Sequence, residues 1–277
     1  MIPRTELQRL AAQAGVRVEL QERDYVLGCF LLGLARLPEV AESLAFKGGT
    51  ALRKIYFPTF RFSEDLDFTV LQPLSEATLQ AQVREVCRRV AADFGIPMQI
   101  ALWKQSRDLP GEEAYRARIS YVGPLGQPGA DPARITLDLT CYETVILPPD
   151  PRPILHPYSD APSSPLTVRV YCLEEMLAEK LRALLRRSYP RDLYDVWYLL
   201  TVQRAQLNQA RFQNVVTAKF EHKGYALESV AALLHLARRP GMDVAWERSV
   251  GHLAPEPHAY AEVLAALETL LQEWLGL

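Results

Sequence analysis

Phe46-Lys47-Gly48-Gly49-Thr50-Ala51-Leu52-Arg53 is followed, after a short gap, by Arg61-Phe62-Ser63-Glu64-Asp65-Leu66-Asp67-Phe68. The glycine pair predicts a turn that opens a helix, because glycine permits close backbone approach and a helix N-terminus presents N–H groups to an anion. The second stretch alternates polar and apolar residues as a strand does, so Asp65 and Asp67 point to the same side. An anion cradle beside two parallel carboxylates suits a metal–triphosphate complex.

A third carboxylate strengthens this interpretation. Asp138 lies between two leucines in the predicted strand Arg134-Ile135-Thr136-Leu137-Asp138-Leu139-Thr140, where a carboxylate is unfavourable without a partner. On a neighbouring strand it would complete the ligands of two metal ions about 3.5–4 Å apart. The plainer alternative is that Asp65 and Asp67 are ordinary solvent-facing residues of an alternating strand.

The composition is that of a globular protein with a substantial core. The chain has 277 residues, of which 49% are hydrophobic and 23% charged, which is enough for one large domain or two ordinary ones. No apolar run approaches the roughly 20 residues of a membrane span, and the N-terminus lacks the layout of a secretory signal. The four cysteines are scattered along the chain, which favours reduced thiols in a cytoplasmic protein.

Two other classes of site find no support in the sequence. The five histidines form neither a two-turn zinc helix nor a Cys/His knuckle, so a histidine-based metal site is not expected. No serine has the flanking glycines of a nucleophile elbow, so a Ser-His-Asp hydrolase is not expected either.

The order of the predicted elements indicates an α+β fold. Its first half is an N-terminal domain with a mixed sheet flanked by helices, and its second half is a mainly helical C-terminal domain. The elements of the first half are, in order, a helix over 23–37, a strand over 44–47, a helix over 50–56, a strand over 61–70, a helix over 75–94, and strands over 97–105, 114–122 and 133–140, with a turn over 123–132.

Seven prolines between Pro148 and Pro165 mark the expected domain boundary, because such a segment is neither a regular helix nor a central strand. We therefore place one domain at residues 1–165 and the other at residues 166–277. Residues 166–171 could return one strand to the first domain. From Leu173 the chain reads as helical, with helices over 173–187, 190–201 and 259–275 among others.

The charge is unevenly spread. The net charge is −2, which argues against a protein that coats nucleic acid. Between Glu179 and Lys223, however, nine basic residues face four acidic ones, nine minus four giving +5. Such a segment could steer a polyanion to one face, or it could simply provide solvated helix surfaces.

The order of these motifs resembles a known superfamily. The glycine pair, then Asp65 and Asp67, then a single later Asp138 is similar to the polymerase-beta-type nucleotidyltransferases. Residues 47–53 with 61–68 are very similar to the signature of the AbiEii/AbiGii group, the toxin components of bacterial toxin–antitoxin and abortive-infection systems. Two further blocks, 179–184 and 191–195, match the same group. The resemblance covers residues 46–200, and nothing specific follows.

The resemblance implies roles for these residues. It implies that Asp65, Asp67 and Asp138 are metal ligands for Mg²⁺, and that Lys180 offsets the charge of the leaving pyrophosphate. Asp192 and Asp195 would position Lys180 or act directly, although acids also favour helix starts in general. Ser63 is either a phosphate ligand or an ordinary turn residue. The implied catalytic set is Asp65, Asp67, Asp138, Lys180 and Asp192, and the implied nucleotide-binding set is Lys47, Gly48, Gly49, Thr50, Arg53, Ser63 and Asp195.

The activity implied is transfer of a nucleoside monophosphate from an NTP to an acceptor hydroxyl, with release of pyrophosphate. The family points to the 3′ end of tRNA as acceptor, which would stop translation, and to a cognate antitoxin, either a DNA-binding or a kinase-like protein. Two alternatives stay open. The acceptor could be a protein side chain or a small molecule, or the chain could be a nucleotide-binding module with little turnover.

Overall fold

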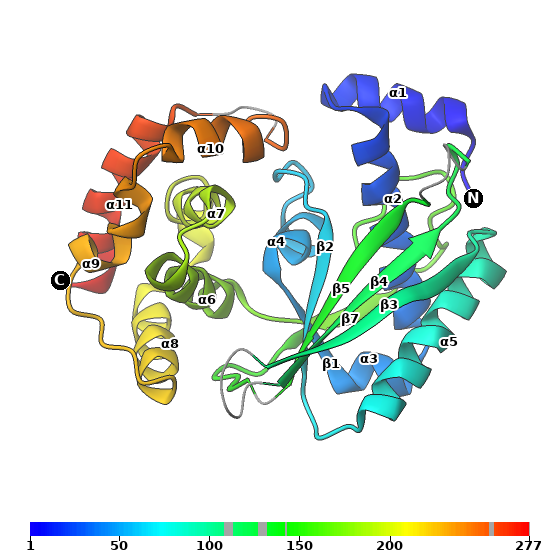
Figure 1. The fold of residues 1–277 in the computed structure, drawn as a ribbon, viewed down its shortest axis with the longest axis horizontal. Helices are drawn as coiled ribbons and strands as arrows, with labels where there is room; N and C mark the ends of the chain where they lie inside the picture. The colour runs from blue at the N-terminus through cyan, green and yellow to red at the C-terminus, as the bar shows by residue number, and fades with distance from the viewer. Residues whose placement is uncertain (108–112, 127–131, 142, 255–257, 277) are drawn as a thin grey trace. The chain divides into compact units, whose positions relative to one another are not determined.

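The computed structural model describes residues 1–107, 113–126, 132–141, 143–254 and 258–276, and Figure 1 shows its elements. The chain forms two compact units. The first comprises Met1–Glu143 and Pro149–Val170, and the second comprises Thr144–Pro148 and Tyr171–Leu277. In the part of the chain that is described, no helix combines the length and the hydrophobicity that crossing a membrane requires.

A mixed seven-stranded sheet forms the centre of the first unit, as the sequence predicts. The strand order is β3-β4-β5-β2-β1-β7-β6. Strand β2 runs parallel to β5 and antiparallel to β1, and β1 runs parallel to β7. The strands are β1 (Leu44–Lys47), β2 (Asp65–Val70), β3 (Met98–Arg107), β4 (Glu113–Tyr121), β5 (Arg134–Thr140), β6 (Asp150–Pro153) and β7 (Thr167–Val170). Strand β2 begins at Asp65, four residues later than predicted, and residues 127–131 of the predicted turn lie outside the described residues.

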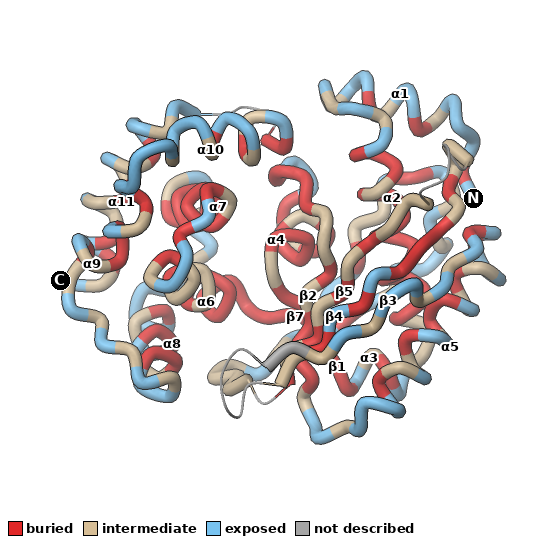
Figure 2. The backbone as a smooth tube through the Cα atoms, in the orientation of Figure 1, coloured by how far each residue is buried: buried red, intermediate tan, exposed pale blue. Residues whose placement is uncertain are grey.

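Helices cover one face of this sheet. Helix α2 (Val18–Ala35) and helix α5 (Glu76–Phe94) pack against each other, and their apolar side chains meet Leu137 and Leu139 of β5. Alternation along β2 sends Leu66 and Phe68, both at most 1% exposed, to the covered face. Figure 2 shows α2 buried along most of its length. The flanking helices α1 (Arg4–Ala14) and α3 (Pro38–Ser43) complete this layer.

The glycine pair opens a helical turn directly after β1. Helix α4 (Gly48–Ala51) continues as a π-helical turn, η1 (Leu52–Tyr56), which ends with a hydrogen bond of 2.7 Å from the Phe57 N–H to the Leu52 carbonyl. The sequence predicted one continuous α-helix here. A π-turn inserts one extra residue per hydrogen-bonded ring and is frequent at functional sites.

The proline-rich segment contributes a strand only at the edge of the sheet. Strand β6 pairs with β7 alone, which agrees with the expectation that prolines exclude a central strand. Strand β7 pairs with β1, so residues 167–170 belong to the first unit. Residues 144–148 belong to the second unit although they precede β6 in sequence. The Ile146 and Leu147 N–H groups donate to the Glu175 carboxylate of α6 at 3.1 and 3.2 Å.

The second unit is helical, as predicted. Its helices are α6 (Leu173–Arg186), α7 (Pro190–Thr201), α8 (Gln209–His222), α9 (Val230–Leu234), α10 (Met242–Ser249) and α11 (Tyr260–Leu275). Pro190 is in the first turn of α7, where its missing N–H costs nothing. In the short connection between α6 and α7, Ser188 adopts a positive φ of 48°. The chain turns sharply at this point.

Lys219 corrects the expectation that the basic segment is a solvated or RNA-binding surface throughout. Its side chain is 1% exposed, and its ammonium lies 2.8 Å from Glu175 and 3.1 Å from Glu179. It also donates to the carbonyl of Thr144 at 3.1 Å. A buried cation needs such partners, so Lys219 joins α8, α6 and residues 144–148 instead of offering charge to a ligand.

Candidate functional site

The glycine turn lies directly against the strand that carries Asp65 and Asp67. Gly48 adopts φ +80°, and a Cβ at this position would lie 2.3 Å from Oδ2 of Asp67. At Gly49 a Cβ would lie 2.8 Å from the Arg61 guanidinium and 3.1 Å from the Ser63 hydroxyl. Only glycine therefore permits the backbone to approach this carboxylate and this hydroxyl so closely.

Two further contacts fix the turn to β2. Lys47 pairs with Asp67 in the β1–β2 register, and the Thr50 hydroxyl donates to the backbone carbonyl of Asp65. Thr50 is 1% exposed, so its hydroxyl holds the local structure together and is not presented to a ligand. Backbone N–H groups at the start of α4 have no intrahelical partner, which makes them the natural anion donors of this turn.

All three predicted carboxylates lie on one face of the sheet. In the β2–β5 register, Asp67 is opposite Asp138 and Asp65 is opposite Thr136. Neighbouring strands are about 4.8 Å apart, so the carboxylates of Asp67 and Asp138 are cross-strand neighbours. Their side is the one that the apolar residues of β2 do not occupy. Carboxylate oxygens are the ligands that divalent cations prefer in proteins.

Arg116 is a member of this cluster that the sequence did not reveal. On β4 it lies opposite Asp138, and its guanidinium binds that carboxylate at two points, 2.7 and 2.9 Å. Hydrogen bonding to Asp138 raises the pKa of Arg116, and the charges of Asp138, Asp65 and Asp67 add to the effect. The four side chains therefore share one electrostatic field, in which Arg116 offsets part of the acidic charge.

The remaining predicted residues of the first unit have different surroundings. Ser63 is 8% exposed and lies next to Gly49. Arg53 is turned towards the core: its guanidinium donates to Asp24 at 2.8 Å and to the carbonyl of Phe60, and it lies 3.6 Å from the centre of the Phe62 ring. Arg53 thus has a supporting position behind the turn, which its sequence spacing from Gly48 did not indicate.

The second unit holds the predicted lysine between the two predicted aspartates. The Lys180 ammonium of α6 lies 2.9 Å from Asp192 and 2.9 Å from Asp195, both on α7. Arg187 also binds Asp192, at 3.2 Å. Burial alone would raise the pKa of Asp192, but Lys180 and Arg187 outweigh it and hold the pKa below its usual range. The ammonium is therefore fixed in place by two buried aspartates of α7.

This pairing makes a prediction about stability. Replacing Lys180 by methionine should lower the free energy of unfolding by about 2–3 kcal/mol at pH 7, because it leaves buried carboxylates short of a partner while Arg187 remains. The depressed pKa of Asp192 means that its contribution is present above about pH 4 and lost as acid protonates it. The difference between variant and wild type should therefore be full from pH 7 down to about pH 4, and it should shrink as the pH falls further.

Urea unfolding at several pH values measures this difference. Arg186→Met is the matched control, because Arg186 is an exposed cation on the same helix and its loss should change stability little. A Lys180→Met effect that is small at pH 7, or constant with pH, would contradict the role of the ion pair.

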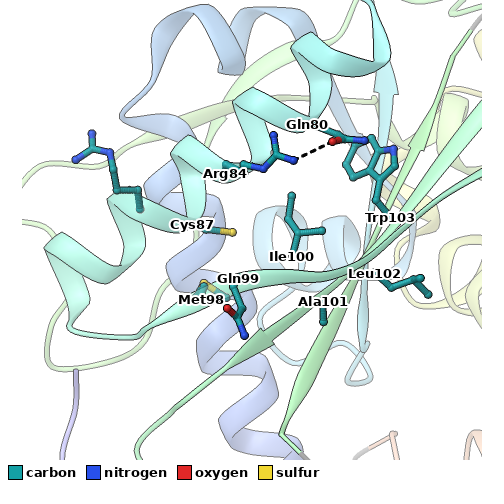
Figure 3. A pocket seen from close by; sticks show the side chains of 10 residues that line it. Gln80, Arg84, Cys87, Met98, Gln99, Ile100, Ala101, Leu102 and Trp103 are labelled. Atoms are coloured by element: carbon teal, nitrogen blue, oxygen red, sulfur yellow. Dashed lines mark hydrogen bonds between the residues drawn. The ribbon is translucent and has the colours of Figure 1, made fainter.

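Two other features of the first unit lie apart from the predicted residues. A pocket of about 580 Å³ lies between α5 and β3 and includes none of the predicted site residues. Figure 3 shows side chains that line it, among them Arg84, Cys87, Ile100 and Trp103. Cys29, His156 and Asp160 come within 4.8 Å of one another. Burial raises the pKa of the Cys29 thiol, which disfavours the thiolate that a metal would need.

Comparison with known proteins places this geometry in a family. The family model described as nucleotidyl transferase AbiEii toxin, type IV toxin–antitoxin system, matches residues 30–273. Among solved structures, the nucleotidyltransferase toxin MenT4 (Rv2826c) from Mycobacterium tuberculosis H37Rv matches with a TM-score of 0.70 and 22% identity over 100% of this chain and 91% of that one. JHP933 from Helicobacter pylori matches with a TM-score of 0.53 and 18% identity over 94% of each chain.

These structural matches show a shared fold, and no curated protein sequence matches significantly. The family model covers 244 of the 277 residues, counted from 30 to 273, and includes every residue of the predicted site. The chain therefore belongs to the AbiEii nucleotidyltransferase toxin family of type IV toxin–antitoxin systems.

Proposed function

We propose that this toxin is a Mg²⁺-dependent enzyme that transfers a nucleoside monophosphate from an NTP to the 3′ hydroxyl of tRNA. The observation that carries the proposal is the glycine turn packed against Asp67, in register with Asp138. A phosphate-binding turn and a carboxylate cluster in contact are what nucleotidyl transfer requires. Modified tRNA 3′ ends would not accept amino acids, which would account for toxicity, and a cognate antitoxin would relieve it.

Each group has a part in the proposed reaction. Asp65, Asp67 and Asp138 would hold the divalent cations, which stabilise charge on the attacking and leaving oxygens. The backbone N–H groups of the glycine turn and the Ser63 hydroxyl would bind the phosphates. Lys180, with its ammonium held by Asp192 and Asp195, would supply positive charge to the departing pyrophosphate.

The bonds balance in a single displacement. The acceptor hydroxyl gives up its proton, and Asp138 would orient the hydroxyl or accept the proton. The hydroxyl oxygen then bonds to the α-phosphorus of the NTP. The bond from that phosphorus to the oxygen of pyrophosphate breaks, and pyrophosphate carries away the electron pair.

The direct test is to incubate the purified protein with Mg²⁺, total cellular RNA and each α-phosphate-labelled NTP in turn. Label in tRNA-sized RNA, lost with EDTA and in Asp65→Asn, supports the proposal and names the nucleotide. Label in protein or in a small molecule would show that the acceptor is that molecule and not tRNA. Tight NTP binding without pyrophosphate release would instead indicate a binding module.

The contact at Gly48 gives a second prediction. Gly48→Ala should lower kcat/KM for transfer at least about tenfold, because its methyl group would displace the Asp67 carboxylate. Gly95→Ala is the matched control: Gly95 has φ +66° but nothing within 4 Å of a built Cβ. Both variants carry the backbone cost of about 1 kcal/mol, so thermal unfolding should shift similarly. Equal kcat/KM in the two variants would disprove the role of the contact.

A further inference from the structure

A second pocket lies beside the carboxylates, on the side away from the glycine turn. It has a volume of about 300 Å³ and is lined by Arg23, Glu64, Asp65, Arg118, Arg134 and Thr136. Asp65 is thus a wall of this pocket as well as a member of the carboxylate cluster. Every lining residue belongs to the first unit.

Strand register explains how the arginines come together. Asp65 is opposite Thr136 on β5, and Thr136 is opposite Arg118 on β4. Arg134 lies two residues before Thr136 and therefore on the same side of β5. Two strand spacings separate Asp65 from Arg118, or about 10 Å. The arginines are consequently close to the carboxylates but not in contact with the glycine turn.

The charge of this face becomes more positive away from β2. Beyond Asp67 and Asp138 come Arg116 on β4 and then Lys104 on β3, which are opposite each other in register. Within the pocket, Arg23 is paired with Glu64. Arg118 is exposed, and it makes no hydrogen bond or ion pair with any residue that the structure describes. Basic side chains beside a cluster of carboxylates form a positively charged surface that attracts a polyanion.

The geometry of phosphoryl transfer decides which polyanion fits. The attacking and leaving oxygens lie roughly in line across the reacting phosphorus. With the leaving pyrophosphate at the glycine turn, beside β1, the acceptor must approach from the opposite side of the carboxylates. That is the β5–β4 side, where the arginines lie. This step rests on the proposed function.

We propose that Arg118, Arg134 and Arg23 bind the phosphodiester backbone of the acceptor RNA strand next to its 3′ end. Arg118 makes the principal contact, and Arg23, held by Glu64, closes the pocket. Arginine is suited to this task because its planar guanidinium binds phosphate oxygens at two points. These contacts position the strand and carry no base preference.

The test measures RNA binding separately from transfer. The probe is a fluorescein-labelled RNA hairpin with a single-stranded 3′ end, and its affinity is measured by anisotropy over a range of NaCl concentrations. Arg118→Gln should weaken binding about tenfold and reduce the slope of log K against log[NaCl] by about one, the signature of one lost phosphate contact. Arg134→Gln should act in the same direction.

Arg84→Gln is the matched control, because Arg84 is an exposed arginine of the same unit on α5. It should bind the probe as the wild type does. The affinity for NTP, measured by calorimetry without RNA, should be unchanged in Arg118→Gln. Thermal unfolding checks that each variant is folded. Because the Arg118 side chain is exposed, its replacement should not disturb the fold.

The outcomes separate this inference from the proposed function. A loss of RNA affinity in Arg118→Gln that Arg84→Gln does not show supports the inference, even if the wild type transfers no nucleotide to the probe. Wild-type protein that does not bind RNA, or equal salt slopes in Arg118→Gln and Arg84→Gln, would overturn it. Weakened NTP binding in Arg118→Gln would overturn it too, and would assign the arginines to the triphosphate.

Discussion

Asp67→Asn should lower kcat/KM for nucleotide transfer by at least about a thousandfold, or roughly 4 kcal/mol, while the protein stays folded. Asp67 contacts the glycine turn and also lies in register with another metal-ligand candidate, Asp138. Asparagine keeps its shape but removes the charge. The divalent cations would lose an anionic ligand, so they would bind more weakly and their position would shift.

Stability should respond in a different way. Asp67 shares its field with Asp65 and Asp138, so removal of one negative charge relieves mutual repulsion. We therefore expect the unfolding temperature of Asp67→Asn to stay within about 2–4 °C of the wild type, the shift that about 1 kcal/mol produces. Direct Mn²⁺ binding should weaken in parallel with activity.

Glu85→Gln is the control for this variant. It removes a surface carboxylate of α5, which pairs with Arg88 and lies outside the cluster. Its transfer rate should remain within a few fold of the wild type, since an exposed ion pair contributes little. If Asp67→Asn kept wild-type transfer, the carboxylate mechanism would be wrong.

Asp24→Ala should destabilise the protein by about 3–5 kcal/mol, the loss expected when a buried charge is left without its partner. The Asp24 side chain is 3% exposed and lies 2.5 Å from the ammonium of Lys54, which is 2% exposed. It also accepts hydrogen bonds from Arg53 at 2.8 Å and from Tyr158 at 2.6 Å. Truncation would therefore leave two cations and a phenol facing a cavity.

The pKa of Asp24 supports the same conclusion. Burial alone would raise this pKa, but Lys54 and Arg53 outweigh it and lower the value. A carboxylate with a depressed folded pKa contributes stability above its unfolded pKa of about 3.9 and loses it as the pH falls further. The destabilisation in Asp24→Ala should thus be full at pH 7 and smaller in strong acid.

Denaturant unfolding of a double-mutant cycle tests this network. Lys54→Met alone should also be strongly destabilising, because it strands the Asp24 carboxylate. The pair Asp24→Asn with Lys54→Met removes both charges and should recover part of the loss. Additive single effects, or a cost near zero for Asp24→Ala, would show that the pair does not stabilise the fold.

Local pattern was enough to predict the glycine turn and the shared side of Asp65 and Asp67 on a strand. Gly48 needs a left-handed backbone, and the spacing of Asp65 and Asp67 on a strand puts both on one side. Both features are determined by residues that are adjacent in sequence, so the sequence alone is sufficient to predict them. The mixed sheet and the helical second half follow from the same kind of periodicity and are confirmed by the structure.

Contacts between distant residues could not be predicted in this way. Arg116 meets Asp138 only because β4 and β5 pair in one particular register. Arg118 and Arg134 are likewise brought together by strand pairing, whereas the basic run that stood out in the sequence includes Lys219, a buried ion-pair partner. Arg53 follows the glycine pair closely, yet the π-turn directs it to Asp24.

Strand β6 ends the sheet in a way that bears on self-association. The Ile154 N–H donates to Leu166, towards β7. Alternation along the strand therefore directs the N–H of Arg152 to the same side and the nitrogens of Pro151 and Pro153 outward. Proline nitrogens carry no hydrogen, so a strand from another chain would find no donors along this stretch of the edge. Addition of a further strand at this edge is therefore disfavoured.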